Sequence, residues 1–297
     1  MTAPDTPGLK ACWQPMTIDR YAAFERATAM KVVKVGDIWW HRVRPFLYRP
    51  LLPFKKYDLN KTTKEFDRIG AFQHGVEDGQ AHNSYLNPIV FDELHDYDIE
   101  SLPYSVRKHI KKALKNSVTV SRIVDEREFS ENAYPAYVSF YERTKYGFDR
   151  SRRTRGGFSR WAHTLFQFPE TVILGAFASR ELVSFEIGCL VEGTLFLKTL
   201  VNSDKALKLG AADLLLHTYR MSSREQPEIR AIFASMLGQS PGINEYYSIR
   251  GARVLSLPAV LHMHPGLRWL IRKTNKRIYG RLLGLSNDEV VANSFAK

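Results

Sequence analysis

Residues 195–224 read LFLKTLVNSDKALKLGAADLLLHTYRMSSR, and this stretch decides how the rest of the chain is interpreted. The apolar run that ends at Val201 predicts a strand, and the polar and basic residues after it predict a turn. Small residues then predict the start of a helix at Gly210. The first amides of a helix have no internal partner and lie at the positive end of its dipole. The stretch is therefore either an ordinary connection or a site that can hold a pyrophosphate.

The composition is that of a folded globular protein, and its positive net charge favours acidic partners. Of the 297 residues, 44% are hydrophobic and 12% aromatic, and the formal net charge is +12. No uninterrupted apolar run approaches the roughly 20 residues that span a bilayer, and no secretory signal begins the sequence. We therefore expect a cytoplasmic protein. Its charge favours phosphates, nucleic acid or an anionic membrane face as partners.

Residues 1–103 predict a mostly β N-terminal subdomain. Strands are expected around a turn at Gly36-Asp37 and again near residues 87–92. Residues 70–85 contain His74 and His82, but the many glycines and the spacing of the histidines predict a loop that either contacts substrate or is merely polar, not a metal site.

Residues 104–264 predict a larger domain in which helices and strands alternate. A basic amphipathic helix, capped by Ser105, is expected up to Asn116. The elements expected after it are a strand at 118–124, helices at 126–146 and 157–168, strands at 171–177, 182–191 and 194–201, a helix from 210, a strand at 231–235, a helix at 242–250 and a strand at 252–257.

This order resembles the GNAT superfamily, the acyl-CoA N-acyltransferase fold, over residues 118 to about 260. The resemblance implies an α/β (α+β) fold, a GNAT-like mixed and splayed β-sheet flanked by helices, with a reduced β-rich subdomain before it. In the family the sheet opens between its fourth and fifth strands, and the pantetheine arm of the donor lies in the opening. The implied co-substrate is acyl-CoA or an acyl-carrier thioester, and no metal is expected.

Two local motifs carry the resemblance further. Residues 207–212, LKLGAA, keep the glycine and the final small residue of the family's phosphate-binding signature but place Leu207 where the family has Gln or Arg. Residues 244–252, NEYYSIRGA, resemble the family's late motif, in which a tyrosine protonates the departing thiolate; Tyr247 takes that position. The resemblance assigns donor binding to Leu200, Val201, Lys205, Lys208, Gly210, Ala211, Ala212 and Asn244.

A general base is also required, because an amine acceptor is protonated at neutral pH. Glu186 lies in the middle of the apolar run VSFEIGCL, where loss of hydration would raise the pKa of its carboxyl group. We expect it to act either as that base or as a buried carboxylate paired with an arginine. Asp213 and His217, four residues apart on one helical face, are second choices.

A second resemblance lies within the same fold. The basic helix at 105–116, the β-rich N-terminal block and residues 246–258, YYSIRGARVLSLP, resemble the Fem-type branch. Enzymes of that branch move an amino acid from aminoacyl-tRNA onto a cell-wall precursor. Their late motif usually reads Phe-Lys, whereas this chain has Tyr246-Tyr247. A thioester donor on CoA or a carrier protein and an aminoacyl-tRNA donor therefore stay as alternatives.

Residues 265–297 form a third, basic segment. Residues 267–283 predict one amphipathic helix with basic side chains and no acidic ones. Its apolar stripe is expected either to pack on the domain or to place the protein at the inner face of the membrane. A further alternative is a non-catalytic scaffold that keeps the fold and binds anions or membranes.

Overall fold

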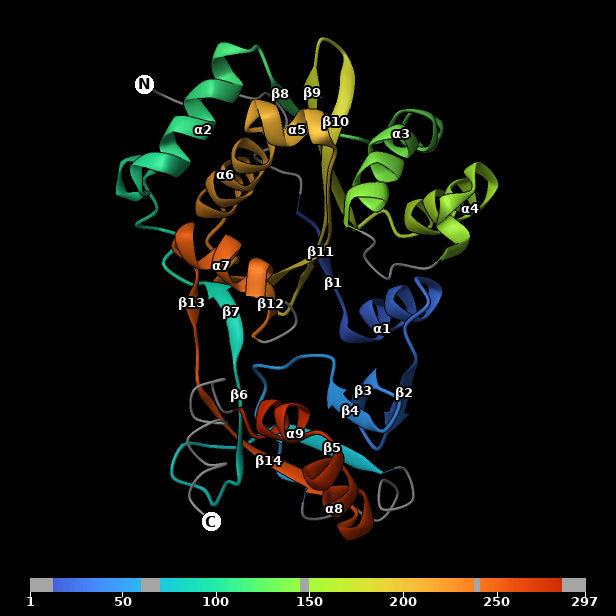
Figure 1. The fold of residues 1–297 in the computed structure, drawn as a ribbon, viewed down its shortest axis with the longest axis vertical. Coiled ribbons are helices and arrows are strands. Elements are labelled where there is room, and N and C mark those ends of the chain that lie inside the picture. Colours follow the sequence, from blue (N-terminus) through green and yellow to red (C-terminus); the bar gives the residue numbers. More distant parts are fainter. Residues whose placement is uncertain (1–12, 60–69, 145–149, 238–240, 285–297) are drawn as a thin grey trace. The chain divides into compact units, whose positions relative to one another are not determined.

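The computed structural model describes residues 13–59, 70–144, 150–237 and 241–284 (Figure 1). They form two compact units. Unit 1 takes its described residues from 1–24, 90–234 and 245–253, and unit 2 takes them from 25–89, 235–244 and 254–297. Each unit is assembled from three separate stretches of sequence. The domain boundaries expected at residues 103 and 264 stay a prediction.

The larger sheet has the order β13-β7-β12-β11-β10-β9-β8, and β1 pairs in parallel with the end of β10. The three strands β9, β10 and β11 are antiparallel neighbours, whereas β11 and β12 are parallel, so the sheet is mixed. The strands are β1 (Pro15–Met16), β7 (Pro88–Phe91), β8 (Thr119–Arg122), β9 (Val172–Ala178), β10 (Glu181–Val191), β11 (Thr194–Asn202), β12 (Ala231–Met236) and β13 (Arg253–Val254).

Helices cover both faces of this sheet (Figure 1). Helix α6 packs on one face with α2 outside it, and α3 packs on the other face beside α4. Because both faces are covered, β10 is buried along nearly its whole length, which explains its continuous apolar run. The helices are α1 (Ile18–Ala27), α2 (Tyr104–Lys115), α3 (Glu126–Thr144), α4 (Arg155–Phe166), α5 (Asp204–Leu209), α6 (Ala211–Arg224) and α7 (Pro241–Ile249), with 3₁₀ turns at Ile99–Ser101 and Arg150–Arg153.

The order of elements expected from residue 118 onward is confirmed, although one further helix is present and the strand expected at 252–257 is only Arg253–Val254. The predicted basic turn after β11 is a helix, α5, because Ser203 caps it by accepting a hydrogen bond from the amide of Ala206. Ser105 is not the cap of α2. The helix begins at Tyr104, and Pro103 occupies the N-cap position. Because proline has no side-chain acceptor, no side chain caps α2.

Unit 2 is built on a second sheet, with the order β2-β3-β4-β5-β14-β6. The polar loop predicted for residues 70–85 is correct only for residues 76–83, because residues 71–75 and 84–86 form β5 and β6 and every residue of β5 is buried. The turn predicted at Gly36-Asp37 is confirmed. The strands are β2 (Val32–Val35), β3 (Ile38–Arg44), β4 (Leu47–Pro50), β5 (Ala71–Gly75), β6 (Ser84–Leu86) and β14 (Leu257–Met263).

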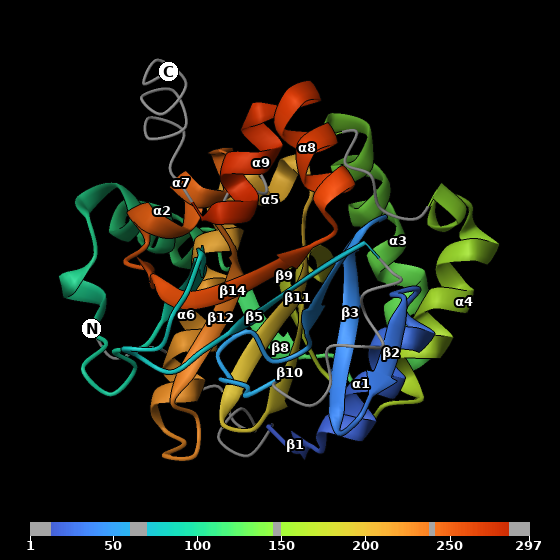
Figure 2. The ribbon, with the colours of Figure 1, turned by 90° about the horizontal axis from the view of Figure 1, so that it is seen from below.

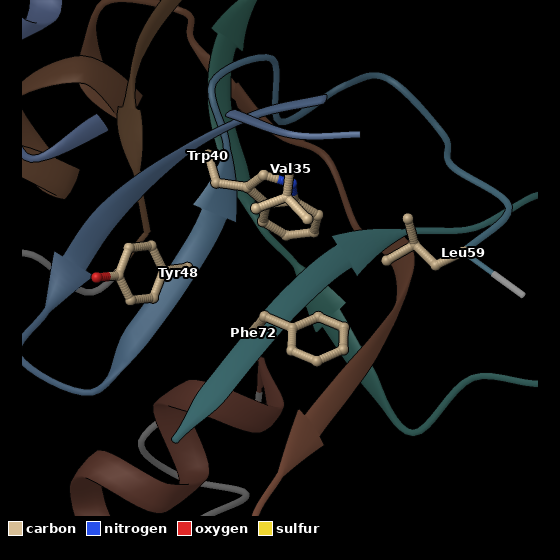
Figure 3. Packing of buried hydrophobic residues seen from close by; sticks show 5 residues of the cluster. All are labelled: Val35, Trp40, Tyr48, Leu59 and Phe72. Atoms are coloured by element: carbon tan, nitrogen blue, oxygen red, sulfur yellow. The ribbon is translucent and has the colours of Figure 1, made fainter. Parts of the chain in front are cut away.

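A compact apolar cluster holds the first strands of this sheet together. Figure 3 shows its five buried side chains, Val35, Trp40, Tyr48, Leu59 and Phe72. The rings of Trp40 and Phe72 meet edge to face, with centroids 5.8 Å apart. Four of the residues come from β2, β3, β4 and β5, and Leu59 comes from the segment after β4, so the cluster ties the turn-linked strands to β5.

The C-terminal basic segment forms two helices, α8 (Pro265–Thr274) and α9 (Lys276–Leu283), where the sequence predicts one. The break is at Asn275, whose side chain accepts a hydrogen bond from the amide of Ile278 and so caps α9. Both helices lie beside β14 (Figure 2), and Ile271 and Leu282 are buried in a cluster with Leu261. Within the described residues, no helix is long and apolar enough to cross a membrane.

Candidate functional site

The larger sheet opens between β11 and β12. These strands pair only at Thr194–Ala231, Leu195–Ile232 and Phe196–Phe233, although β11 continues to Asn202. On its other edge β11 stays paired with β10, but the register shifts so that Lys198 has no partner residue. Such a bulge bends a strand and increases its twist. The bulge lies two residues beyond the last pair with β12, at the point where the sheet opens as the resemblance implies.

Glu186 lies next to this opening, on the central strand β10. Its neighbours in register are Leu200 on β11 and Leu174 on β9. The residue is only 1% exposed, and neither carboxylate oxygen has a hydrogen-bond partner among the described residues. Burial raises the pKa of the carboxyl group to about 8. Folded proteins rarely leave such a group unpaired, and a buried acid with a raised pKa is characteristic of functional sites.

Two adjacent tyrosines of α7 belong to the same region of unit 1. The Tyr246 hydroxyl is buried without a partner among the described residues, and burial raises the pKa of the phenol. Arg250 lowers that pKa, whereas the charges of Asp213 and Glu186 raise it, so the phenol lies within electrostatic reach of Glu186. Tyr247 is 7% exposed, with its ring edge-on to Phe91 at 6.2 Å.

A buried ion pair fixes α7 against α6. The Nε of Arg250 donates to Asp213 at 2.6 Å, and its Nη1 donates to the Tyr246 carbonyl at 2.6 Å. The guanidinium also lies 3.6 Å from the centroid of the Tyr246 ring. The second oxygen of Asp213 is 3.0 Å from Nδ1 of His109 on α2. Asp213, a second-choice base, is thus engaged on both oxygens.

A small pocket lies beside this ion pair, between α2 and α6. The second-choice base His217 lines it, with its Nδ1 2.7 Å from the Tyr97 hydroxyl. Burial, followed by the charges of Arg220 and Arg224, lowers the pKa of His217 to about 4, so the ring is neutral near pH 7. Burial also raises the pKa of Tyr97 to about 12. The Tyr97 hydroxyl and the His217 ring are therefore hydrogen-bonded to each other inside unit 1.

Gly210 links α5 to α6 in a left-handed conformation, with a φ of 77°. A Cβ atom built on it would lie 2.4 Å from the His109 carbonyl oxygen of α2. Close packing against α2 therefore explains the glycine without a ligand. Ala211 and Ala212, which follow it in α6, are buried.

The remaining residues expected to bind the donor have varied surroundings. The carbonyl of Val201 accepts a hydrogen bond from Ser184, whereas Leu200 is half-buried opposite Glu186. Lys205 is exposed on α5 and forms an ion pair with Glu181 at 2.5 Å. Lys208 is exposed on the same helix, and Asn244 lies on α7 with a buried amide oxygen that has no partner in the described chain.

Sequence interpretation found Glu186 but missed Tyr246 and Arg250 as part of the same arrangement. A signal was present, since Tyr246 and Arg250 are four residues apart and meet on one face of a helix. The described part of the chain contains no group of three or more His, Cys, Asp or Glu side chains that could hold a metal ion.

Comparison with known proteins identifies the fold. No family profile matches the chain, and no curated protein matches it. It is similar to the C-terminal domain (DUF2156) of a putative lysylphosphatidylglycerol synthetase from Agrobacterium fabrum, with 9% identity, a TM-score of 0.56, and coverage of 92% of this chain and 95% of that one. It is similar to L-PGS from Bacillus licheniformis, with 13% identity, a TM-score of 0.56, and coverage of 91% and 98%. It is also similar to FemX, with 8% identity, a TM-score of 0.53, and coverage of 90% and 96%. The chain therefore has the fold of FemX and of these synthetases, which is the Fem-type fold that the resemblance implies.

Proposed function

We propose that this protein is an N-acyltransferase that moves an acyl group from an activated donor onto an amine. The observation that carries the proposal is the unpaired, buried carboxylate of Glu186 beside the point where β11 leaves β12. A thioester of CoA or of a carrier protein is the donor we favour. Its slender arm would lie along β11 beyond Phe196, where β11 no longer pairs with β12.

In this proposal Glu186 takes a proton from the attacking amine. Once ionised, a carboxyl group whose pKa is about 8 is a stronger base than an exposed one. Near pH 7 most of it is protonated, so only its ionised fraction acts as the base. The amine nitrogen attacks the acyl carbonyl, the new C–N bond forms, and the C–S bond to the donor breaks. The departing thiolate then takes a proton from a phenol, and the phenolate is reprotonated through solvent as Glu186 releases the proton it took from the amine.

Two phenols are candidates for that second proton transfer. The sequence motif favours Tyr247, whereas the unpaired hydroxyl near Glu186 favours Tyr246. Arg250 would then be a positioning residue, because it holds the Tyr246 ring and backbone against α6. Single substitutions of each tyrosine by phenylalanine distinguish the two, since each removes one hydroxyl and leaves the ring.

The test is release of free thiol from a panel of CoA thioesters in the presence of primary amines. We expect Glu186→Gln to lower kcat by about 10²- to 10⁴-fold while donor binding, followed by thermal shift, is unchanged. Glu181→Gln, on an exposed position of the same strand, is the matched control and should leave kcat unchanged. Full activity of Glu186→Gln would remove the proposed base.

Aminoacyl-tRNA is the second candidate donor, supported by the Fem-type motif and by a likeness to FemX that extends over 90% of this chain. Transfer of labelled amino acid from charged tRNA to an amine tests it, with binding measured over a salt series. Binding to tRNA through several phosphate contacts should weaken steeply as salt rises. If neither donor class is turned over while both bind, the non-catalytic scaffold accounts for the fold better than an enzyme does.

A further inference from the structure

Helix α8 carries an exposed face on which apolar and basic side chains alternate. We define the α8 face as Arg268, Trp269, Leu270, Arg272 and Lys273, all exposed. The exposed fractions are 62% for Trp269 and 48% for Leu270. Large hydrophobic side chains at this exposure cost free energy in water unless a partner covers them.

The α8 face is not needed for packing within unit 2. Leu267 and Ile271, on the side of the helix away from Trp269, pack in the cluster that includes Leu47 and Leu261. Residues 267 and 271 are one turn apart, whereas Trp269 lies about half a turn from both. The apolar side chains of α8 therefore divide into two groups. Leu267 and Ile271 pack within unit 2, whereas Trp269 and Leu270 are exposed.

The charge around this face has a single sign. The sequence contains no aspartate or glutamate between Glu245 and Asp288, and α8 and α9 contribute six basic residues. Among the described residues, no acidic side chain forms an ion pair with any of them. They are Arg268, Arg272, Lys273, Lys276, Arg277 and Arg281. The surface is thus complementary to a partner that is negative over an extended area.

We propose that the α8 face docks on an anionic lipid bilayer. Trp269 would lie at the level of the headgroups, Leu270 would enter the apolar boundary, and the basic side chains would contact lipid phosphates. Nucleic acid would match the charge, but it offers no apolar phase for an exposed leucine. The Nζ of Lys273 lies 4.9 Å from the Trp269 ring centroid, so a cation and an indole already share one position on the surface. The proposal does not depend on the transferase activity.

Cosedimentation of the full chain with lipid vesicles tests the docking. We compare vesicles of phosphatidylcholine alone with vesicles that also contain phosphatidylglycerol. Each basic residue near an anionic surface contributes a factor of about 5 in partitioning. Arg272→Glu combined with Lys273→Glu should therefore lower partitioning to the anionic vesicles at least about 25-fold.

The matched control reverses two charges on the other basic helix, α2, with Lys111→Glu and Lys112→Glu. Both of these side chains are exposed, and the net charge changes by the same amount. The control should alter vesicle binding only a few-fold through long-range charge. Equal losses in the two double variants would mean that binding follows net charge alone, and this would overturn the α8 face as a docking surface.

Tryptophan fluorescence supplies a second readout. Trp269 is exposed, whereas Trp13, Trp40 and Trp161 are buried and Trp39 is half-buried. Binding to anionic vesicles should shift the emission to shorter wavelength, and Trp269→Phe should abolish most of that shift while the protein still sediments. Unchanged emission on binding, or tighter binding of an RNA duplex that depends on Arg272 and Lys273, would contradict membrane docking.

Discussion

Glu186→Gln should change how the stability of the protein depends on pH. The pKa of the Glu186 carboxyl group is raised by burial from its ordinary value of 4.5 to about 8. In the unfolded chain the group regains its ordinary pKa. Between pH 4.5 and 8 the unfolded chain therefore releases a proton that the folded protein keeps.

The sign of the effect follows from this difference. The contribution of Glu186 to the free energy of unfolding is complete below pH 4.5 and is lost as the pH rises through 8. The interval from 4.5 to about 8 corresponds to about 5 kcal/mol. Glutamine has a similar shape but no ionisable group. The free energy of unfolding of Glu186→Gln therefore does not fall as the pH rises through this interval. The free energy of unfolding of Glu186→Gln, relative to that of the wild type, should rise by about 5 kcal/mol from acidic to basic pH.

Thermal unfolding by circular dichroism, measured from pH 5 to pH 9, follows this gain directly. For a chain of this length a change of 1 kcal/mol shifts the Tm by about 2 °C. The difference in Tm between Glu186→Gln and the wild type should therefore change by about 10 °C over this pH range. Gly242→Ala, which removes no titratable group and has nothing near its Cβ position, should run parallel to the wild type. If the Glu186→Gln and wild-type curves are parallel over the whole interval, the carboxylate is not held in an unpaired, dry position.

Two further predictions concern packing. Gly210→Ala should lower the stability by at least about 3 kcal/mol, because the residue has a left-handed conformation and a Cβ would approach His109 too closely. Gly242→Ala, with nothing near its Cβ position, should change the Tm little, and equal Tm values for the two variants would refute the packing argument. Trp40→Ala should cost about 3–5 kcal/mol in urea or thermal unfolding, because the indole is buried in the core of unit 2. Trp269→Ala should stay within about 0.5 kcal/mol of the wild type, and a similar loss in both would show that Trp269 packs inside the protein.

Local sequence patterns predicted the elements of unit 1 because those elements are long and strongly patterned. The apolar run around Glu186 predicted a buried strand, and the charged residue within it was visible at once. Two short elements, α5 and β5, were not predicted. α5 depends on the Ser203 cap, and β5 contains Gln73 and His74, which a tertiary arrangement buries in spite of their polarity. Such burial depends on contacts far away in the sequence, as with Gln73, whose amide donates to the Leu282 carbonyl at 2.9 Å.

The choice between Tyr246 and Tyr247 shows where local patterns reach their limit. Adjacent residues of a helix point about 100° apart, so only the rotation of α7 decides which phenol faces Glu186. That rotation depends on Arg250, one turn further on, which is held by Asp213 of α6. A motif records the order of residues but not this rotation. If the ion pair sets it, Arg250→Ala should weaken the dependence of activity on Tyr246, measured as a smaller further loss on Tyr246→Phe than in the wild type. Equal losses in both backgrounds would mean that other contacts orient α7.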